Sequence, residues 1–233
     1  MVKIAINGAA GRMGGRIVAL AEASKDFEII GKFDASGPSK LSADALKKGG
    51  KGVLIDFSSP AGTREALACA EQAGWALVIG TTGLDEAAQK EIETASRKIP
   101  VVFSSNMSIG VNVVLALLEL ASKKLPRSFS VEMSEAHHVH KKDAPSGTAL
   151  MLAKRIAAAR PLDFAALSKS IKVIREGEIV GDHSVVFAGP DETIEIRHHA
   201  RSRDIFAQGA LLAARFAASA HPGNYSMADV LLK

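Results

Sequence analysis

The chain has 233 residues, of which 47% are hydrophobic and 23% charged, a composition that excludes disordered and fibrous classes. The net charge of +4 comes from interspersed residues of both signs and aromatic content is only 5%, so neither a nucleic acid nor a membrane is an expected partner. The lone Cys69 cannot form an internal disulfide and no targeting segment is visible, so we expect a cytoplasmic protein.

The first half of the sequence alternates short apolar runs with helical patterns, which predicts a parallel sheet flanked by helices. The runs are continuously apolar, as is typical of strands covered on both faces. The fold class predicted here is therefore α/β, with a doubly wound, Rossmann-like sheet. Strands are predicted at residues 3–7, 28–34, 52–57, 76–80 and 101–104, with helices at 12–23, 63–73 and 85–98.

Beyond Asn106 the pattern changes and predicts a second, α+β domain with an open sheet of antiparallel or mixed pairing. Its helices are predicted at residues 108–124 and 148–159, and its strands at 128–138, 171–175, 178–187 and 193–199. Gly177 is predicted to be the hairpin turn between strands 171–175 and 178–187. A last helix at 205–218 has no partner in this sheet and is expected to return to the first domain. The predicted domains are residues 1–106 with 204–233, and residues 107–203.

A glycine-rich loop, Gly8-Ala-Ala-Gly11-Arg-Met-Gly14, follows the first predicted strand and opens the first helix. Glycines at this point allow backbone N–H groups to approach a pyrophosphate at the positive end of the helix. Asp34 lies 20 residues beyond Gly14 at the end of the second strand, where an acid hydrogen-bonds the adenosine ribose. Together they predict a nicotinamide dinucleotide site; the alternative is a structural turn beside a solvated acid.

Two further loops end the fourth and fifth predicted strands: Gly-Thr-Thr-Gly at residues 80–83 and Ser-Ser-Asn-Met at 104–107. Ligands of open α/β sheets bind at the carboxyl ends of the strands, so both loops are expected to line the nicotinamide half of the site. Taken alone, each loop is an ordinary turn sequence.

Residues 135–148 gather histidines, lysines, an acid and a helix start in the string Glu-Ala-His-His-Val-His-Lys-Lys-Asp-Ala-Pro-Ser-Gly-Thr. A histidine titrates near neutrality and suits a general acid, while a lysine beside it suits a carboxylate anchor. A helix N-terminus with hydroxyls favours an anion. These parts fit a dianionic substrate. The alternatives are a solvated polar loop and a zinc site, although successive strand residues point to opposite faces, and we predict no metal.

The string from Glu135 to Ala149 strongly resembles the substrate and catalytic motif of the 4-hydroxy-tetrahydrodipicolinate reductase (dihydrodipicolinate reductase) family, which acts in the diaminopimelate and lysine pathway. The resemblance extends over essentially the whole chain. Its other segments are residues 8–14, 80–83, 104–112, 175–183, 198–203 and 206–209.

The resemblance implies an oxidoreductase that uses NADH, NADPH or both on a small dicarboxylate. The family's reaction is loss of water from a hydroxylated ring, hydride delivery to ring C4 and protonation of the neighbouring carbon. The implied proton donor is His137, and Lys141 is implied to contact a substrate carboxylate and assist the acid step. The implied substrate-binding residues are His138, Gly147 and Thr148. The implied cofactor contacts are Gly8, Ala9, Ala10, Gly11, Arg12, Met13, Asp34, Gly80, Thr81, Thr82, Ser104, Ser105, Asn106 and Met107.

Residues 1–106 with 204–233 are therefore expected to bind the dinucleotide, and residues 107–203 to bind the substrate and oligomerise. The family implies a homotetramer, and an open sheet leaves edges and an apolar face that assembly through this sheet would cover. We expect NADH to be used at least as well as NADPH, because Asp34 would repel a 2′-phosphate. The alternatives are another Rossmann-type dehydrogenase, which would not need the string at 135–148, and a non-enzymatic dinucleotide-binding module.

Overall fold

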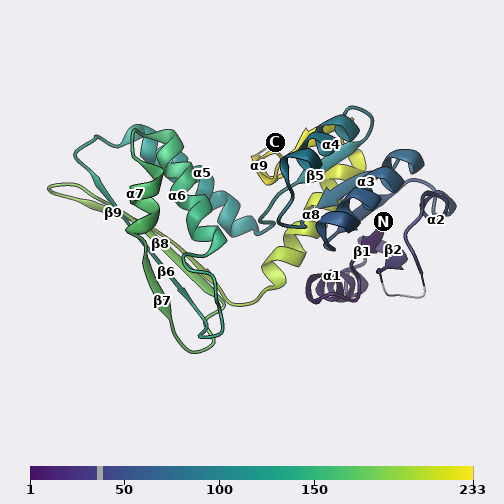
Figure 1. Cartoon of the computed structure of the whole chain (residues 1–233), viewed down its shortest axis with the longest axis horizontal. Coiled ribbons are helices and arrows are strands. Elements are labelled where there is room, and N and C mark those ends of the chain that lie inside the picture. Colours follow the sequence, from purple (N-terminus) through teal and green to yellow (C-terminus); the bar gives the residue numbers. More distant parts are fainter. Residues whose placement is uncertain (36–38, 233) are drawn as a thin grey trace. The chain divides into compact units, whose positions relative to one another are not determined.

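The structure is a computed structural model that describes residues 1–35 and 39–232. Residues 36–38, after the second predicted strand, and Lys233, the last residue of the predicted C-terminal segment, lie outside the described residues. The chain divides into two units (Figure 1): unit 1 is Met1–Ile109 with Asp204–Lys233, and unit 2 is Gly110–Arg203. In the part of the chain that the structure describes, no helix has the length and apolar character needed to cross a membrane.

Unit 1 is a six-stranded parallel sheet with the strand order β10-β5-β4-β3-β1-β2. The strands are β1 (Val2–Asn7), β2 (Phe27–Phe33), β3 (Val53–Asp56), β4 (Ala76–Ile79), β5 (Pro100–Phe103) and β10 (Gly223–Tyr225). The helices are α1 (Arg12–Glu22), α2 (Ala43–Lys48), α3 (Pro60–Ala73), α4 (Glu86–Ser96), α8 (Asp204–Ser219) and α9 (Met227–Leu232).

The two faces of this sheet carry separate hydrophobic clusters. Ile4 and Ile6 of β1 pack with residues of α1, α8 and α9, while Ala5 between them packs with residues of α2, α3 and α4. Side chains alternate between the faces of a strand, so continuously apolar strands serve both clusters. The predicted doubly wound sheet is confirmed, and α8 packs in this unit.

Unit 2 is a four-stranded mixed sheet with the order β7-β6-β8-β9. β6 (Ser130–His137) runs parallel to β7 (Lys172–Arg175) and antiparallel to β8 (Gly181–Ala188), which pairs antiparallel with β9 (Thr193–Ala200). The helices α5 (Ile109–Lys124), α6 (Gly147–Ala159) and α7 (Phe164–Lys169) cover one face (Figure 1). Met133, Val185 and Phe187 of the sheet pack beneath them, which confirms the predicted open mixed sheet.

The predicted hairpin at Gly177 is wrong, because β7 and β8 lie on opposite edges of β6. Gly177 does turn the chain, with φ of 48°, but the turn passes around the end of β6. The carbonyl oxygens of Gly177 and Ile179 accept hydrogen bonds from the N–H groups of Val139 and His138, at 3.2 and 2.7 Å. A central strand offers hydrogen bonds on both edges, so each of the two segments pairs with β6 instead of with the other.

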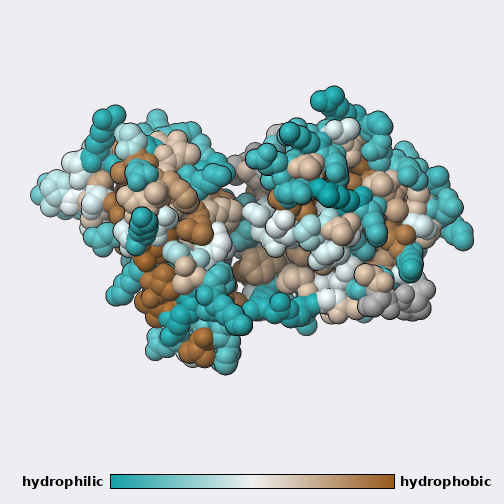
Figure 2. Space-filling model, viewed as in Figure 1, coloured by the Kyte–Doolittle hydropathy of each residue, from teal (hydrophilic) through white to brown (hydrophobic). Residues whose placement is uncertain are grey.

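The outer face of this sheet is polar, not apolar as expected. Ser184 Oγ donates a hydrogen bond to Glu195 Oε1 at 2.7 Å, and Asp182 contacts the side chains of Arg197 and His199 across β8 and β9. Exposed large hydrophobic side chains of unit 2 occur instead on α5, just after β6, beside and on the short helix α7, and on the edge strand β7. They are Val113, Leu117, Leu120, Val139, Leu162, Phe164 and Val173, and Figure 2 shows hydrophobic surface on this unit.

Candidate functional site

The glycine loop between β1 and α1 is packed so closely that it needs glycine at two positions. Gly8 has φ of 81°, and a Cβ there would lie 2.4 Å from the carbonyl oxygen of Phe57. A Cβ on Gly14 would lie 2.0 Å from the carbonyl oxygen of Gly8. The helix α1 begins after Gly11, which provides no side-chain cap, and its first turn carries no acidic residue. The N-terminus of α1 therefore fits a pyrophosphate group.

The loop is hydrogen-bonded to the end of β2, the strand that precedes Asp34. The N–H groups of Gly8 and Ala9 donate to the carbonyl oxygen of Phe33 at 2.9 and 3.0 Å, and the N–H of Ala10 donates to Asp34 Oδ2 at 3.0 Å. Two of the predicted cofactor elements are thus joined directly. Of the predicted loop residues, Ala10, Gly11 and Arg12 are exposed, Ala9 and Met13 are half-buried, and Gly8 is buried.

The two loops after β4 and β5 present some of the predicted residues and bury others. Thr82 and Ser105 are exposed, and Gly80 and Ser104 are half-buried. Asn106 and Met107 are 8% and 2% exposed, and the Met107 side chain belongs to the hydrophobic core. In this structure Met107 therefore presents little side-chain surface to a ligand.

Asp56, at the end of β3, was missed by sequence reasoning. Its fully buried carboxylate accepts four hydrogen bonds at 2.6 to 2.9 Å from polar side chains at or near the ends of three adjacent strands and near the start of α3. The donors are Asn7 Nδ2, Ser58 Oγ, Thr63 Oγ1 and Thr81 Oγ1. The Thr81 hydroxyl therefore donates to a buried carboxylate inside the protein. An acid that ends an apolar strand, as in Val53-Leu-Ile-Asp56, is the sequence signal that was available.

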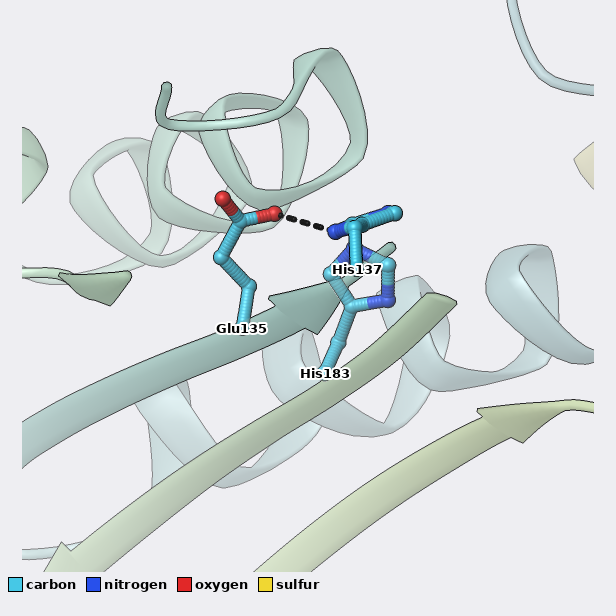
Figure 3. Close-up of side chains that lie close together, drawn as sticks. All are labelled: Glu135, His137 and His183. Atoms are coloured by element: carbon cyan, nitrogen blue, oxygen red, sulfur yellow. Dashed lines mark ion pairs between the residues drawn. The ribbon is translucent and has the colours of Figure 1, made fainter. Parts of the chain in front are cut away.

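In unit 2 the covered face of the sheet changes from apolar to polar at the end of β6. Glu135 and His137 lie two residues apart on β6, on the same face as Met133. His183, on the neighbouring strand β8, is the cross-strand partner of Glu135. Glu135 is 1% exposed, His137 7% and His183 6%. Figure 3 shows the three side chains converging, with Glu135 Oε2 2.9 Å from His137 Nδ1.

The Glu135 carboxylate is held by two other groups. Its Oε1 accepts hydrogen bonds from Arg175 Nη2 at 2.8 Å and from the N–H of Ser146 at 3.2 Å. Burial would raise the pKa of Glu135, but these hydrogen bonds and the charges of His137 and Arg175 outweigh it and lower the pKa. Glu135 is therefore a carboxylate at neutral pH.

Both buried histidines favour the neutral imidazole. Burial lowers the pKa of His137, and the charges of Lys141 and Arg175 lower it further against the opposing charge of Glu135. Burial, with smaller contributions from His137 and His198, lowers the pKa of His183 to about 4. His183 Nε2 lies 3.2 Å from Ser146 Oγ. The cluster thus combines an ionised carboxylate with two mainly neutral imidazoles near Ser146, the residue that precedes α6.

The loop between β6 and α6 carries the other predicted substrate residues. Lys141 Nζ contacts Asp143 at 2.8 Å, and Arg175 donates hydrogen bonds to the carbonyl oxygens of Lys141 and Asp143 at 3.3 and 2.7 Å. Arg175 therefore connects the loop that bears Lys141 to Glu135. Ser146 caps α6 through its hydroxyl, Gly147 is exposed and Thr148 is half-buried. His138 is half-buried, and its Nε2 lies 3.5 Å from Arg203 Nη2.

Glu135, His137 and His183 are side chains of the kind that bind metal ions, and one ligand atom of each lies within 4.8 Å of the others. The same carboxylate is, however, hydrogen-bonded to the guanidinium of Arg175. A divalent cation here would meet that positive charge and the nearby charge of Lys141. The donor set therefore fits a network of hydrogen bonds and ion pairs better than a metal centre.

A doubly wound sheet with a glycine loop and an inserted α+β unit is the architecture of a dinucleotide-dependent oxidoreductase. The family model described as "Dihydrodipicolinate reductase, N-terminus" matches residues 2–107, and "Dihydrodipicolinate reductase, C-terminus" matches residues 110–231. The chain belongs to the dihydrodipicolinate reductase family.

Relatives named 4-hydroxy-tetrahydrodipicolinate reductase match this chain over nearly its full length. Those of Burkholderia mallei (strain SAVP1) and Burkholderia thailandensis are 44% identical over 99% of this chain and 98% of the relative. A dipicolinate-bound dihydrodipicolinate reductase from Paenisporosarcina sp. TG-14 shares the fold, with a TM-score of 0.83, 23% identity and 98% of each chain covered. The DAP dehydrogenase of C. glutamicum is a more distant fold relative, with a TM-score of 0.59, 15% identity, and 99% of this chain and 93% of that chain covered.

Proposed function

We propose that this chain reduces 4-hydroxy-tetrahydrodipicolinate to tetrahydrodipicolinate with NADH or NADPH, in diaminopimelate and lysine biosynthesis. The observation that carries the proposal is the full-length identity of 44% to relatives of that name. The buried cluster around His137 and the loop with Lys141 supply an acid and a cation, which this reaction needs.

Unit 1 is the dinucleotide-binding part in this proposal, and the loop from Gly8 to Met13 holds the pyrophosphate. Its tight packing and uncapped helix N-terminus support this assignment. Asp34 binds the adenosine ribose, and the loops at residues 80–82 and 104–107 hold the nicotinamide half. Bound nicotinamide supplies the hydride for ring C4.

His137 is the proton donor in the proposed mechanism. Its pKa is lowered by burial in the free protein, so the imidazole is mainly neutral before substrate binds. A dianionic substrate brings negative charge to the site and raises this pKa, because an opposite charge favours the protonated imidazole. Substrate binding therefore favours protonation of His137, which then donates this proton to the ring carbon.

The substrate carboxylates are held by charged and dipolar groups of unit 2. Lys141 offers an ammonium group, and the N-terminus of α6 offers the N–H groups of Gly147 and Thr148. His138 completes the set. The Asp143 carboxylate that contacts Lys141 is the group a substrate carboxylate would replace as its partner.

We also propose that the protein is a homotetramer assembled through the sheet of unit 2. Helices cover one face of this sheet, while the other carries exposed side chains on β9 and half-buried ones on β8. Because this outer face is polar, the contacts expected there are hydrogen bonds and ion pairs around a few small apolar side chains.

The proposed activity is tested by offering the condensation product of pyruvate and aspartate semialdehyde and following the absorbance of NADH or NADPH. We expect oxidation of the dinucleotide that depends on the condensation product. The control is the same mixture with aspartate semialdehyde omitted. Dinucleotide oxidation with an amino acid or a sugar, and none with the condensation product, would contradict the proposal.

A further inference from the structure

Glu135 is the buried carboxylate to which this inference applies, and its two oxygens have different partners. Oε1 is occupied by Arg175 from β7 and by the N–H of Ser146 at the start of α6. Oε2 faces His137 Nδ1 at 2.9 Å. Among the residues that the structure describes, neither Oε2 nor Nδ1 has a hydrogen-bond partner, so their close approach is the polar contact that each buried atom makes. Each of these two buried atoms therefore needs the other.

The ring of His137 is also confined on its other side. A Cβ on Gly181 of β8 would lie 3.0 Å from His137 Nε2 and 3.4 Å from its Cδ2, so glycine leaves just enough room for the ring. The His183 ring lies edge-on to that of His137, with centroids 5.2 Å apart. Neighbours on β6 and β8 thus leave the imidazole little freedom to turn.

We propose that Glu135 is a positioning residue for His137, which holds a proton on Nδ1 and leaves Nε2 to serve the substrate. The proposal rests on the proposed function of His137 as the proton donor. A carboxylate that accepts from one imidazole nitrogen fixes the tautomer and the orientation of the ring, and it favours the protonated form.

The proton balance of this step is simple. The Nε2–H bond of the imidazolium breaks, its electron pair stays on Nε2, and the proton forms a C–H bond at the ring carbon next to the one that received the hydride. His137 becomes a neutral imidazole that keeps its proton on Nδ1, opposite Glu135. Solvent then restores the proton on Nε2, and Glu135 stays ionised throughout.

The charged groups around His137 determine how its protonation responds to Glu135. Glu135 on β6 and Asp143 in the following loop favour the imidazolium, while Lys141 in that loop and Arg175 on β7 oppose it. On β8, His183 is neutral at neutral pH. Glu135 is the negative group in contact with the ring, so removing its charge leaves two cations and a distant carboxylate.

The variant Glu135→Gln tests the proposal, because it keeps the shape and the acceptor for Arg175 and Ser146 but presents an NH₂ group to Nδ1. We expect the alkaline limb of the kcat profile to move to lower pH by about one unit, with activity above neutrality reduced about tenfold. The matched control is Glu178→Gln, which removes an 84% exposed carboxylate 3.8 Å from His140 and should leave the profile unchanged. A uniformly slower Glu135→Gln enzyme with an unshifted profile would overturn the proposal.

A second measurement observes the tautomer of His137 directly and does not depend on turnover. ¹⁵N NMR of the wild-type protein at neutral pH reports which nitrogen of His137 carries the proton. The His137 signals are assigned as those absent from the spectrum of the His137→Gln variant. We expect the proton on Nδ1, and on Nε2 in Glu135→Gln. A wild-type proton on Nε2 would reject the role of Glu135, whereas undiminished turnover in His137→Ala would reject the acid role of His137, so the two failures are distinguishable.

Discussion

Asp34 accepts a hydrogen bond from the N–H of Ala10, with 3.0 Å between Oδ2 and the nitrogen. The carboxylate is thereby held beside the glycine loop, at the place where the ribose of a dinucleotide binds in this type of fold. A fixed negative charge at this point accepts hydrogen bonds from a ribose diol and repels a 2′-phosphate.

We therefore predict that kcat/KM for NADH is at least equal to that for NADPH. Asp34→Asn keeps an acceptor but removes the charge, so the NADPH to NADH ratio should rise by about tenfold, or about 1.4 kcal/mol. Steady-state kinetics with both dinucleotides measures this ratio, and Asp191→Asn, an exposed position in unit 2, is the control. A wild-type preference for NADPH greater than about tenfold would show that Arg12 or another group outweighs Asp34.

Replacing His137 or Lys141 with alanine should lower kcat by about 10²-fold or more, the usual contribution of general acid catalysis. Lys141→Ala should raise the substrate KM more, because it removes a charged anchor. NADH affinity, measured by direct titration, should barely change, because the proposed cofactor residues lie in unit 1.

The double variant should lose less than the product of the two single effects if the residues act as one unit. Lys142→Ala, at the exposed neighbour of Lys141, is the control and should retain the wild-type rate. Near wild-type kcat in His137→Ala would move the acid role to His138 or to a bound water.

The stability of the protein should fall as the pH is lowered from 6.5 towards 4, with His183 as a main contributor. Its folded pKa of about 4 lies below the usual 6.5, so the unfolded chain binds more protons between these values. Unfolding is then favoured by acid, and His183 accounts for about 2 to 3 kcal/mol of lost stability by pH 4.5.

Urea unfolding at pH 7.5 and pH 4.5 measures this loss. His183→Gln should lose markedly less stability than the wild type between the two pH values, while His140→Gln, at a 76% exposed side chain, should behave as the wild type. An unchanged pH dependence in His183→Gln would show that other groups control acid unfolding.

Light scattering should give a mass about four times the 24.4 kDa of one chain. Val186→Arg places a bulky charge on the outer face of the unit 2 sheet, at a half-buried position opposite Glu195, and should dissociate the assembly. Leu120→Arg, at a 56% exposed position on α5, should leave it intact. Dissociation by Leu120→Arg alone would place the interface on the helical side, and a stable wild-type monomer would exclude the tetramer.

The elements that the sequence predicted correctly are those with a long, periodic pattern. Continuous apolar runs such as Val53-Leu-Ile indicated strands buried on both faces, and the helix predicted at 12–23 agrees with α1. The unpredicted α2, α7 and α9 have six residues each, too few for a clear period, and β10 has three, beginning with Gly223. β10 is a strand because it pairs with β5, which is not a local property.

The candidate site was only partly predictable for the same reason. The string at 135–148 predicted His137 and Lys141 as site residues, because all its residues are close in sequence. His183 and Arg175 join Glu135 through the register of β6 with β8 and β7, and a register across distant strands is not visible in a single sequence. Gly177 shows the limit most plainly, since its local turn preference was right and its pairing was wrong.

The strand β10 lies beside β5, although all of unit 2 is inserted between them in the chain. During synthesis, the inserted unit has all its residues once Arg203 has left the ribosome, while unit 1 still lacks α8, β10 and α9. The usual order in which an N-terminal domain completes folding first is thereby reversed. Until residue 225 emerges, β5 is an open sheet edge, so the nascent chain exposes a strand that the finished protein protects.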